Sequence, residues 1–491
     1  MAKFQIVGKL REALNKLNLD HGEQIASADY QAAIDFLYSR INYEKGHASY
    51  SSANYRLDRM RRLLELLGKP QNRYRIVHVA GTKGKGTTSH AIANLLGTCG
   101  LRVGVYTSPH LLRLEERIQC IGRDCSAGEL IRLVDRMRQA AETLETEGSG
   151  RPTFFELMTA MGMLHFAEVG CDYVVLEVGL GGRLDSTNVC QPVASVITSI
   201  SLDHQAQLGH SITEIAREKA GIIKRAIPVI STAQHPDARQ VIVQTAREQD
   251  ATLFLIDRDF SVTWRPIPNQ HAASSADDPA RAVVDYRTRK PKSWIGDSQW
   301  RLPLLGRHQA DNLAAALTVF DILFETHPWP EETKPKLQSA LLGLKVPARL
   351  QVVGHAPIRI IDTAHNPSSI TATIDALDVH FPNAPRTIVF ASSRDKDFED
   401  MLKILLTRCQ RVVLTAYQNN VRGLPLVDLE ATAHAIASQL ARSKSTSAQI
   451  AVAPNAFQAW QVAVNSSGPQ DLICGTGSFF LAAELLAMID G

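Results

Sequence analysis

The sequence has few cysteines, no paired cysteine motif and no long hydrophobic run. Seven cysteines are scattered over 491 residues without C-x-x-C spacing, which argues against both a disulfide framework and a structural zinc site. The first residues, M-A-K-F-Q-I-V-G-K-L-R, lack an apolar core of signal-peptide length, and no run of ~18 apolar residues occurs. We therefore expect a cytoplasmic protein that neither spans nor binds a membrane.

An excess of charge of one sign is also missing. Fifty-three basic residues stand against 50 acidic ones, which leaves a net charge of +3 without any long block of like charge. This balance gives no indication of a nucleic-acid partner or a polybasic membrane surface. With 45% hydrophobic and 21% charged residues, the chain has an ordinary globular composition, and its length suits two or three domains of about 150 residues each.

A strand, a glycine-rich loop and a helix are predicted within residues 74–99. An apolar run with β-branched residues fills 74–80, and apolar residues then recur at helical spacing from Ile92 to Cys99. The glycines of the loop allow backbone N–H groups to approach an anion, a lysine adds charge, and two threonines add hydroxyls at the positive end of the helix. These loop residues are Gly81, Gly84, Lys85, Gly86, Thr87 and Thr88. We interpret the loop as a phosphate site, with a simple tight turn as the alternative.

The loop departs from the usual G-x-x-x-x-G-K-[ST] pattern. Val79 stands where the first glycine belongs, and Gly86 separates Lys85 from Thr87. The prediction of phosphate binding therefore depends on the flanking strand and helix as well as on the loop.

Glu177 lies near the end of an almost continuous apolar run at residues 171–178. Such a run is typical of a parallel strand that is covered on both faces. A buried carboxylate is costly unless a cation compensates for it, and in nucleotide-binding α/β folds that cation is usually Mg²⁺. Glu177 is therefore a candidate magnesium ligand.

Two more predicted strands end in polar side chains. Ser108 and His110 follow the strand predicted at 101–106, and Asp203 and His204 follow the strand predicted at 194–200. Open α/β sheets bind ligands at the carboxyl ends of their strands. A plain turn at Ser108 and a structural role for His204 are the alternatives.

Several conspicuous residues have structural explanations. Thr153 and Glu156 have capping-box spacing, which predicts a helix start and accounts for Glu156 without catalysis. Phe154 and Phe155 fit a core equally well, and Lys219 would ordinarily be a solvated helix lysine. Residues 266–298 are polar and show little periodicity, so we expect an insertion or mobile loop there.

A domain boundary is predicted at residues 345–348, where a new alternation of strands and helices begins. We expect an α/β protein with an N-terminal domain over 1–345, built on a mainly parallel sheet that carries the phosphate loop, and a smaller Rossmann-like α/β domain over 346–491. The second domain has polar loops after its strands, including T-A-H-N-P at 363–367 and S-S-R-D-K-D at 392–397.

Taken together, these motifs resemble those of the folylpolyglutamate synthases and dihydrofolate synthases, which are relatives of the muramyl-peptide ligases. The matching pieces, in the family's order, are V-A-G-T-K-G-K-G-T, Y-T-S-P-H-L, E-R-I, L-E-V-G-L-G-G-R-L-D-S-T-N, S-L-D-H, R-E-K-A-G-I, P-A-R-L-Q, D-T-A-H-N-P and G-T-G-S-F-F-L. They extend from about residue 29 to the C-terminus. The resemblance implies an ATP-dependent ligase whose active site lies between the two domains.

The resemblance also implies roles for individual residues. The implied ATP contacts are Gly81, Thr82, Lys83, Gly84, Lys85, Gly86, Thr87, Thr88, Asn312, Arg349 and Asp362. The implied ligands of Mg²⁺, of which we expect two ions, are Ser108, Glu177 and His204. The implied folate contacts are Thr153, Phe154, Phe155, Glu156, Leu184, Asp185 and Ser186. Lys219 matches a lysine that is carbamylated to N6-carboxylysine in the family. With Lys85, Glu177, His204 and His365, it completes the expected catalytic set.

The implied reaction joins L-glutamate to a folate carboxylate. ATP would convert a carboxylate oxygen into a leaving group by forming an acyl phosphate, so the site must cancel charge around the γ-phosphate. We expect folylpolyglutamate synthase activity and also dihydrofolate synthase activity on dihydropteroate, in a monomer. Lys83 stands where the family most often has Asn, and N-N-V-R at 419–422 lacks the usual proline before its arginine.

Two other functions are compatible with the phosphate loop. A muramyl-peptide ligase would share the ATPase, but it carries a nucleotide-sugar domain before that loop, where this sequence has 73 residues that we interpret as helical. A non-catalytic nucleotide-binding switch would need neither the polar residues at Glu177 and His204 nor the D-T-A-H-N loop.

Overall fold

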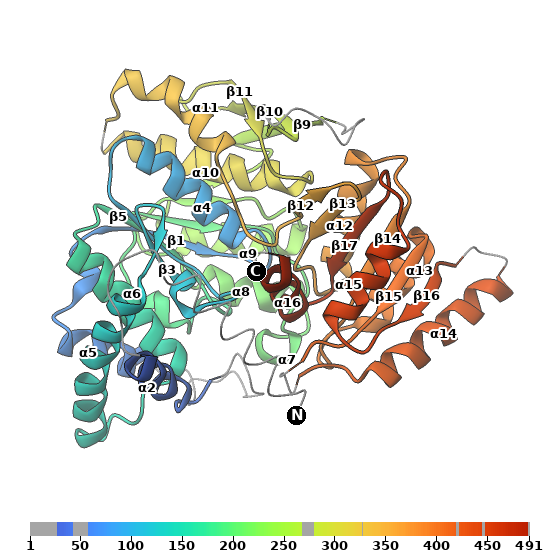
Figure 1. Cartoon of the computed structure of the whole chain (residues 1–491). Coiled ribbons are helices and arrows are strands. Elements are labelled where there is room, and N and C mark those ends of the chain that lie inside the picture. The colour runs from blue at the N-terminus through green and yellow to red at the C-terminus, as the bar shows by residue number, and fades with distance from the viewer. Residues whose placement is uncertain are drawn as a thin grey trace.

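The computed structural model describes residues 27–42, 57–267, 279–326, 328–418, 422–443 and 447–489. The first 26 residues and residues 43–56 lie outside this part. The first half of the chain forms an eight-stranded sheet in the order β4-β3-β2-β5-β1-β6-β7-β8 (Figure 1). The six strands from β2 to β8 are parallel, and β3 and β4 form an antiparallel hairpin at one edge. Their bounds are β1 Arg75–Ala80, β2 Val103–Tyr106, β3 Ile118–Cys120, β4 Arg123–Asp124, β5 Tyr173–Glu177, β6 Ala194–Ile197, β7 Val229–Ser231 and β8 Leu253–Leu255.

Helices cover both faces of this sheet. One face packs on α4 and α10, and the opposite face packs on α2, α3, α5 and α6. The bounds are α2 Ser27–Tyr38, α3 Leu57–Leu66, α4 Lys85–Thr98, α5 Ala127–Thr146, α6 Phe154–Val169, α7 Gln205–Leu208, α8 Ile212–Ala220, α9 Pro236–Glu248, α10 His308–Phe324 and α11 Lys334–Leu342. Short 3₁₀ turns are η1 Pro70–Asn72, η2 Leu114–Arg117, η3 Ser186–Val189 and η4 Glu331–Thr333. The fold class predicted for this half is confirmed.

Strand β1 lies at the centre of the sheet and carries apolar side chains on both faces, with His78 as its one buried polar residue. Residues from Ile76 to Ala80 are buried, which suits a strand between two helical layers. Strands β5 and β6 pair with it in parallel, and Val79 lies opposite Glu177. This register places the carboxylate of Glu177 beside the loop that follows β1.

The helix start predicted from the capping-box spacing of Thr153 and Glu156 is confirmed. The Thr153 hydroxyl accepts from the Glu156 N–H at 3.2 Å, and Glu156 accepts from the Thr153 N–H at 2.7 Å. Ser211 and Glu214 form the same reciprocal arrangement at the start of α8. Helix α10 begins at His308.

The expectation of an irregular insertion at 266–298 is wrong for the residues that the structure describes there. Strands β9 Phe260–Pro266, β10 Ala282–Thr288 and β11 Ser298–Leu302 form an antiparallel sheet in the order β11-β10-β9. Alternate residues of β10 are buried, with Val284 and Tyr286 packing toward α10 in one core. The alternation predicts a strand, but the polar residues on its other face concealed it. Residues 268–278 lie outside the described part.

The second half of the chain forms a six-stranded sheet in the order β12-β13-β17-β14-β15-β16 (Figure 1). Strands β13 to β17 run parallel, and β12 is antiparallel at the edge. The strands are β12 Gln351–His355, β13 Ile358–Ile361, β14 Arg386–Phe390, β15 Arg411–Leu414, β16 Gln449–Val452 and β17 Leu472–Thr476. The helices are α12 Pro367–His380, α13 Phe398–Arg408, α14 Leu426–Arg442, α15 Ala456–Asn465 and α16 Phe479–Ile489.

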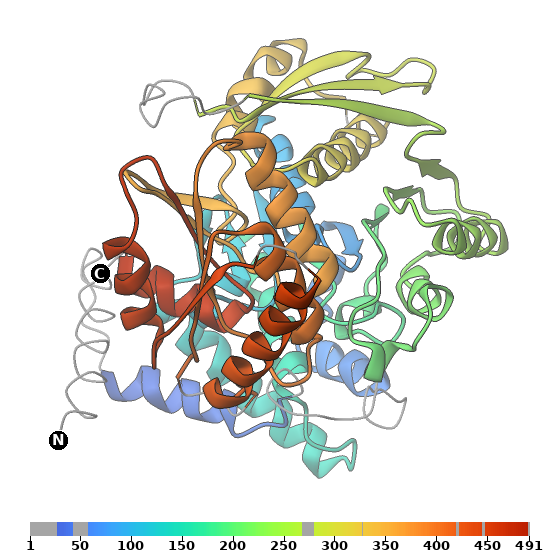
Figure 2. The ribbon, with the colours of Figure 1, turned by 90° about the vertical axis from the view of Figure 1, so that its right-hand side faces the viewer.

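The boundary predicted near residue 345 falls between α11 and β12. Figure 2, turned by 90°, shows the second sheet with its helices in front of the first sheet, and the small β9–β11 sheet above. None of the described helices is sufficiently long and apolar to cross a bilayer.

Candidate active site

A cavity of about 1040 Å³ lies between the two halves of the molecule. One wall comes from the loops after β1, β2, β5 and β6. The other wall comes from the segments that follow α11, β13 and β14 and from the start of α16. The lining residues of this second wall include Arg349, Asp362, His365, Lys396, Arg422 and Phe479. The cavity therefore receives the carboxyl ends of strands from both sheets.

The loop after β1 needs glycine at two positions for close approach. Gly81 has φ +152°, and a Cβ there would lie 1.7 Å from the Thr198 hydroxyl oxygen. Gly84 has φ +87°, and a Cβ there would lie 2.2 Å from the Asn312 side-chain oxygen. The loop is thus packed against β6 on one side and α10 on the other, which places Asn312 at the phosphate loop as the sequence predicts.

Two lysine ammonium groups converge on one carbonyl oxygen in this loop. Lys85 Nζ donates to the Gly81 carbonyl at 3.2 Å, and Lys219 Nζ donates to the same oxygen at 2.9 Å. Burial, together with the neighbouring positive charge of Lys85, lowers the pKa of Lys219 to about 7. Lys219 is therefore a buried amine that is partly neutral at physiological pH.

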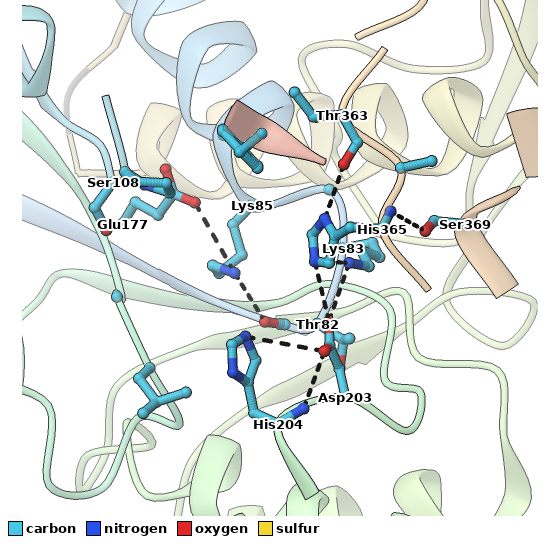
Figure 3. A pocket seen from close by; sticks show the side chains of 18 of the residues that line it. Thr82, Lys83, Lys85, Ser108, Glu177, Asp203, His204, Thr363, His365 and Ser369 are labelled. Atoms are coloured by element: carbon cyan, nitrogen blue, oxygen red, sulfur yellow. Dashed lines mark hydrogen bonds and ion pairs between the residues drawn. The ribbon is translucent and has the colours of Figure 1, made fainter. Parts of the chain in front are cut away.

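Glu177 faces Lys85 from the neighbouring strand. Its Oε1 lies 4.0 Å from Lys85 Nζ, and the residue is 4% exposed. Burial raises the pKa of Glu177, an effect that Lys85 opposes. The Ser108 backbone N–H also bonds to this carboxylate, and Figure 3 shows Ser108, Glu177 and Lys85 side by side in the cavity. The predicted pairing of Lys85 with Glu177 in one cavity thus agrees with the geometry.

The residues around Glu177 fit a hard divalent cation. A carboxylate that is buried with one lysine 4.0 Å away has spare acceptor capacity, and oxygen donors are the ligands that Mg²⁺ prefers. The Ser108 hydroxyl and the His204 ring also line the cavity. His204 precedes α7, and 42% of its side chain is exposed. Their assignment as metal ligands stays a prediction.

Asp203 joins the two walls of the cavity. Its carboxylate accepts from Lys83 at 3.0 Å in the first wall, and from Lys396 at 2.9 Å and Asn366 at 3.2 Å in the second. The His365 ring nitrogen Nε2 lies 3.5 Å away (Figure 3). Burial alone would raise the pKa of Asp203, but these partners, led by Lys83, hold it well below its usual value.

His365 is held as a neutral imidazole with an assigned tautomer. Its Nδ1 lies 2.8 Å from the Thr363 carbonyl oxygen, which can only accept, so Nδ1 carries the proton. Its Nε2 then accepts from the Lys83 ammonium at 2.8 Å. Burial and the charge of Lys83 lower the pKa of His365 to about 4.

Arg349 and Asp362 meet in the second wall. Asp362 accepts from the Leu350 N–H at 3.0 Å and from the Ala364 N–H at 2.9 Å, which holds the carboxylate against the backbone. Arg349 bonds to the Thr363 hydroxyl and lies over the Phe479 ring at 5.0 Å. Both residues line the cavity with Asn312, so the three predicted ATP contacts outside the loop border the same cavity.

The predicted folate residues divide into two groups. Those that line the cavity are Thr153, Phe155, Glu156, Leu184, Asp185 and Ser186. Glu156 is ion-paired with Arg59 at 2.9 Å, and Asp185 accepts from the Gly179 and Leu180 N–H groups. Phe154 instead is fully buried and stacks on Tyr38 with ring centroids 5.4 Å apart. The structure therefore places Phe154 in the core, because the first turn of α6 turns it away from the cavity while Phe155 faces it.

Thr88 is the other predicted site residue that is absent from the cavity lining. Its side chain is fully buried on α4, whereas the loop residues from Gly81 to Thr87 line the cavity. The roles of Thr88 and of the loop residues from Gly81 to Thr87 in binding ATP stay predictions.

Sequence reasoning assigned no role to several cavity residues. The sequence places Asp203 at the correct sheet edge but does not reveal its partners across the cavity. Those partners, Lys396 and Asn366, lie in the loops S-S-R-D-K-D and T-A-H-N-P, which only the tertiary fold brings close to Asp203.

Arg117 lies in the E-R-I motif. It is fully buried, donates through Nε to His110 at 2.8 Å, and lies over the Phe154 ring at 5.2 Å.

Arg422 lines the cavity and pairs with Asp395 at 2.6 Å. It is the arginine of the N-N-V-R segment. The other three residues of that segment, 419–421, lie outside the described part.

Comparisons with known proteins agree with this architecture. The Mur ligase middle domain matches residues 79–320, and the Mur ligase, glutamate ligase domain matches residues 348–479. The chain is 36% identical over 370 residues to folylpolyglutamate synthase of Lacticaseibacillus casei, which covers 75% of this chain and 83% of the relative. It is 36% identical over 379 residues to dihydrofolate synthase/folylpolyglutamate synthase of Bacillus subtilis, which covers 77% and 83%.

Solved structures superpose over nearly the whole chain. The folylpolyglutamate synthase of Mycobacterium tuberculosis complexed with ADP gives a TM-score of 0.80 at 27% identity, covering 94% of this chain and 99% of that one. A folylpolyglutamate synthase complex with AMPPCP and folate gives 0.72 at 30% identity, covering 94% and 100%. The fold and the two-walled phosphate site are those of an ATP-dependent ligase of the Mur ligase type. Within that class, the chain belongs to the folylpolyglutamate synthase and dihydrofolate synthase family.

Proposed function

We propose that this protein joins L-glutamate to a folate carboxylate at the expense of ATP. The observation that carries the proposal is the convergence of Lys85, Lys219 and Glu177 around the glycine loop in a cavity shared by both domains. A nucleotide switch has no need for a second wall of charged residues, whereas a ligase must bring three substrates together. Relatives of the same family are named for this activity.

The chemistry begins with two anions that repel each other. The folate carboxylate attacks the γ-phosphorus of ATP and gives an acyl phosphate and ADP. The Lys85 ammonium and the loop N–H groups supply positive charge where the phosphate charge develops. Mg²⁺, held by Ser108, Glu177 and His204, would neutralise further phosphate charge when it is bound.

The second step needs a glutamate amine and a route for its proton. We place glutamate at the second wall, where the cations of Lys396 and Arg422 can face its carboxylates. The neutral amine attacks the acyl carbon, the bond from that carbon to the phosphate oxygen breaks, and the departing phosphate takes up the proton that the nitrogen loses. His365, neutral with a proton on Nδ1, lies where it can orient the amino acid between the walls.

Lys219 is proposed to carry a carbamate in the active enzyme. Its lowered pKa makes the amine nucleophilic toward CO₂, and the product anion would relieve the repulsion with Lys85. We further propose that the enzyme accepts both dihydropteroate and reduced folates, since the relatives include proteins named for both activities. We also propose that it works as a monomer.

The experiment is glutamate-dependent ADP release, with dihydropteroate, tetrahydrofolate and a UDP-sugar peptide supplied in turn. We expect turnover with the two pterins and none with the UDP-sugar peptide. Lys85→Ala and Glu177→Ala should each reduce ligation by about 10³-fold or more with the fold intact. Lys336→Ala, at an exposed lysine of α11, is the matched control and should leave the rate unchanged. Near-normal turnover in Glu177→Ala would refute the proposed site.

A further inference from the structure

Two free cysteines lie in contact at the edge of the first sheet. Cys120 ends β3, and Cys171 stands just before β5, so strand β2 lies between their strands. Their Sγ atoms are 3.2 Å apart although the residues are 51 positions apart in the chain. Both thiols are unbonded and buried, with 2% and 4% of each residue exposed.

The contact follows from the way the sheet packs on α6. Gly104 of β2 pairs with Cys120 on one side and with Val174 on the other. A Cβ at Gly104 would lie 2.5 Å from the Phe166 ring, so β2 has no side chain there to separate its neighbours. Cys120 and Cys171 both belong to the core under α6, and the fold therefore brings them together without a covalent bond.

Cys171 also borders a pocket at the surface. This pocket of about 410 Å³ is lined by residues around the start of β1 and β5, including Arg73, Arg75, Cys171 and Asp172. It lies at the amino ends of those strands, opposite the carboxyl ends that form the ligase cavity. One member of the pair therefore borders a surface pocket that a small hydrophilic oxidant can enter.

We propose that Cys120 and Cys171 form a reversible disulfide when the protein meets hydrogen peroxide. One thiolate attacks the peroxide oxygen and becomes a sulfenic acid, and the other oxygen leaves as water after it takes a proton. The second thiolate attacks the sulfenic sulfur, the S–S bond forms, and a second water leaves. Two thiols lose two electrons and two protons, and one peroxide is reduced to two waters. A dithiol returns the pair to the reduced form by exchange.

The bond would tie the edge hairpin to the interior of the sheet. Strand β3 joins the sheet through β2, so a link to Cys171 anchors it to the segment before β5 as well. A cross-link over a separation of 51 residues restricts the unfolded chain. For a chain of this length, we expect the melting temperature Tm to rise by about 4 °C. Disulfides of this kind in reducing compartments are transient and form under oxidative conditions.

The test is to treat the reduced full-length protein with stoichiometric hydrogen peroxide and map its peptides without reduction. We expect a peptide pair linked through Cys120 and Cys171, a mass loss of about 2 Da and a higher Tm. Dithiothreitol should reverse all three effects. Cys120→Ser and Cys171→Ser should each abolish the mass loss and the rise in Tm. Cys125→Ser is the matched control: Cys125 is 3% exposed in the same core, and this variant should retain both effects.

Two outcomes would overturn the proposal. One is wild-type protein in which peroxide adds oxygen to the cysteines without any linked peptide. The other is a linked peptide that joins a different pair, such as Cys171 with Cys190. Because both are read on the wild-type chain, a failure of either serine variant to fold does not affect the conclusion.

Discussion

Lys219 lies in an environment that predicts a dependence of ligation on CO₂. Its ammonium group shares the Gly81 carbonyl oxygen with Lys85, so two positive charges converge on a single acceptor. A carbamate forms only on a neutral amine, because the nitrogen lone pair must attack the carbon of CO₂. The pKa of Lys219 therefore decides how readily the modification forms.

The structure gives a magnitude for this effect. With a pKa of about 7, roughly three quarters of Lys219 side chains are neutral at pH 7.5, whereas an ordinary lysine is neutral in about one molecule in a thousand. Burial and the charge of Lys85 thus increase the reactive fraction several hundredfold. At pH 6 the neutral fraction falls to about one tenth, so carbamylation should rise steeply between pH 6 and 8.

The assay compares enzyme that has been dialysed free of CO₂ with the same enzyme after incubation in bicarbonate. We expect ligation to fall at least tenfold without CO₂ and to recover on its addition, with a carbamate signal in ¹³C NMR that grows between pH 6 and 8. Lys219→Ala should be inactive, and a small carboxylic acid should restore part of its activity. Full activity of the wild type after exhaustive CO₂ removal would refute the reasoning, as would an active Lys219→Arg variant.

Three further predictions follow from other contacts. Asp203→Asn leaves two partly buried ammonium groups, those of Lys83 and Lys396, without their carboxylate. We expect a loss of about 1–2 kcal/mol in the free energy of unfolding and slower ligation; an unchanged denaturation midpoint would contradict this. Phe155→Ala should raise KM for folate while the fold persists, whereas Phe154→Ala should cost about 3–5 kcal/mol of stability, measured by urea unfolding. Burial lowers the pKa of His78 to about 3, so the folded protein keeps this imidazole neutral. The contribution of His78 to the free energy of unfolding is therefore complete above about pH 6.5 and is lost as the pH falls toward 3. At pH 4.5 the loss is about 3 kcal/mol, and His78→Asn should flatten that part of the pH profile.

The features that were predictable from the sequence are those with local signatures. The apolar run at β1, the glycines after it and the threonine and glutamate of the capping box all act within a few residues. Glu177 was found for a similar reason, because a carboxylate in an apolar strand is locally anomalous. Its distance from Lys85 depends on the pairing of Val79 with Glu177, which a parallel sheet supplies once both strands are recognised.

The features that escaped prediction depend on tertiary contacts. Strand β10 carries Asp285 and Arg287 beside Val283 on its outer face, and only its packing against α10 shows that the face of Val284 and Tyr286 is buried. Phe154 and Phe155 are adjacent and chemically identical, so their sequence gives no reason to prefer one as a cavity residue. In the first turn of α6, Phe154 stacks on Tyr38 in the core, and Phe155 faces the cavity.

The ionic cluster around Asp203 links the two walls of the cavity through charged groups. The cluster contains one carboxylate and two ammonium groups, Lys83 and Lys396, while His365 is neutral. It therefore has an excess of positive charge at the point where the phosphate loop meets the second domain. An anion that binds there attracts groups from both walls, and removal of Asp203 would turn the same contact into a repulsion between Lys83 and Lys396. The departure of Lys83 from the commonest family residue is thus compensated within the cluster, since Asp203 and His365 both accept from it.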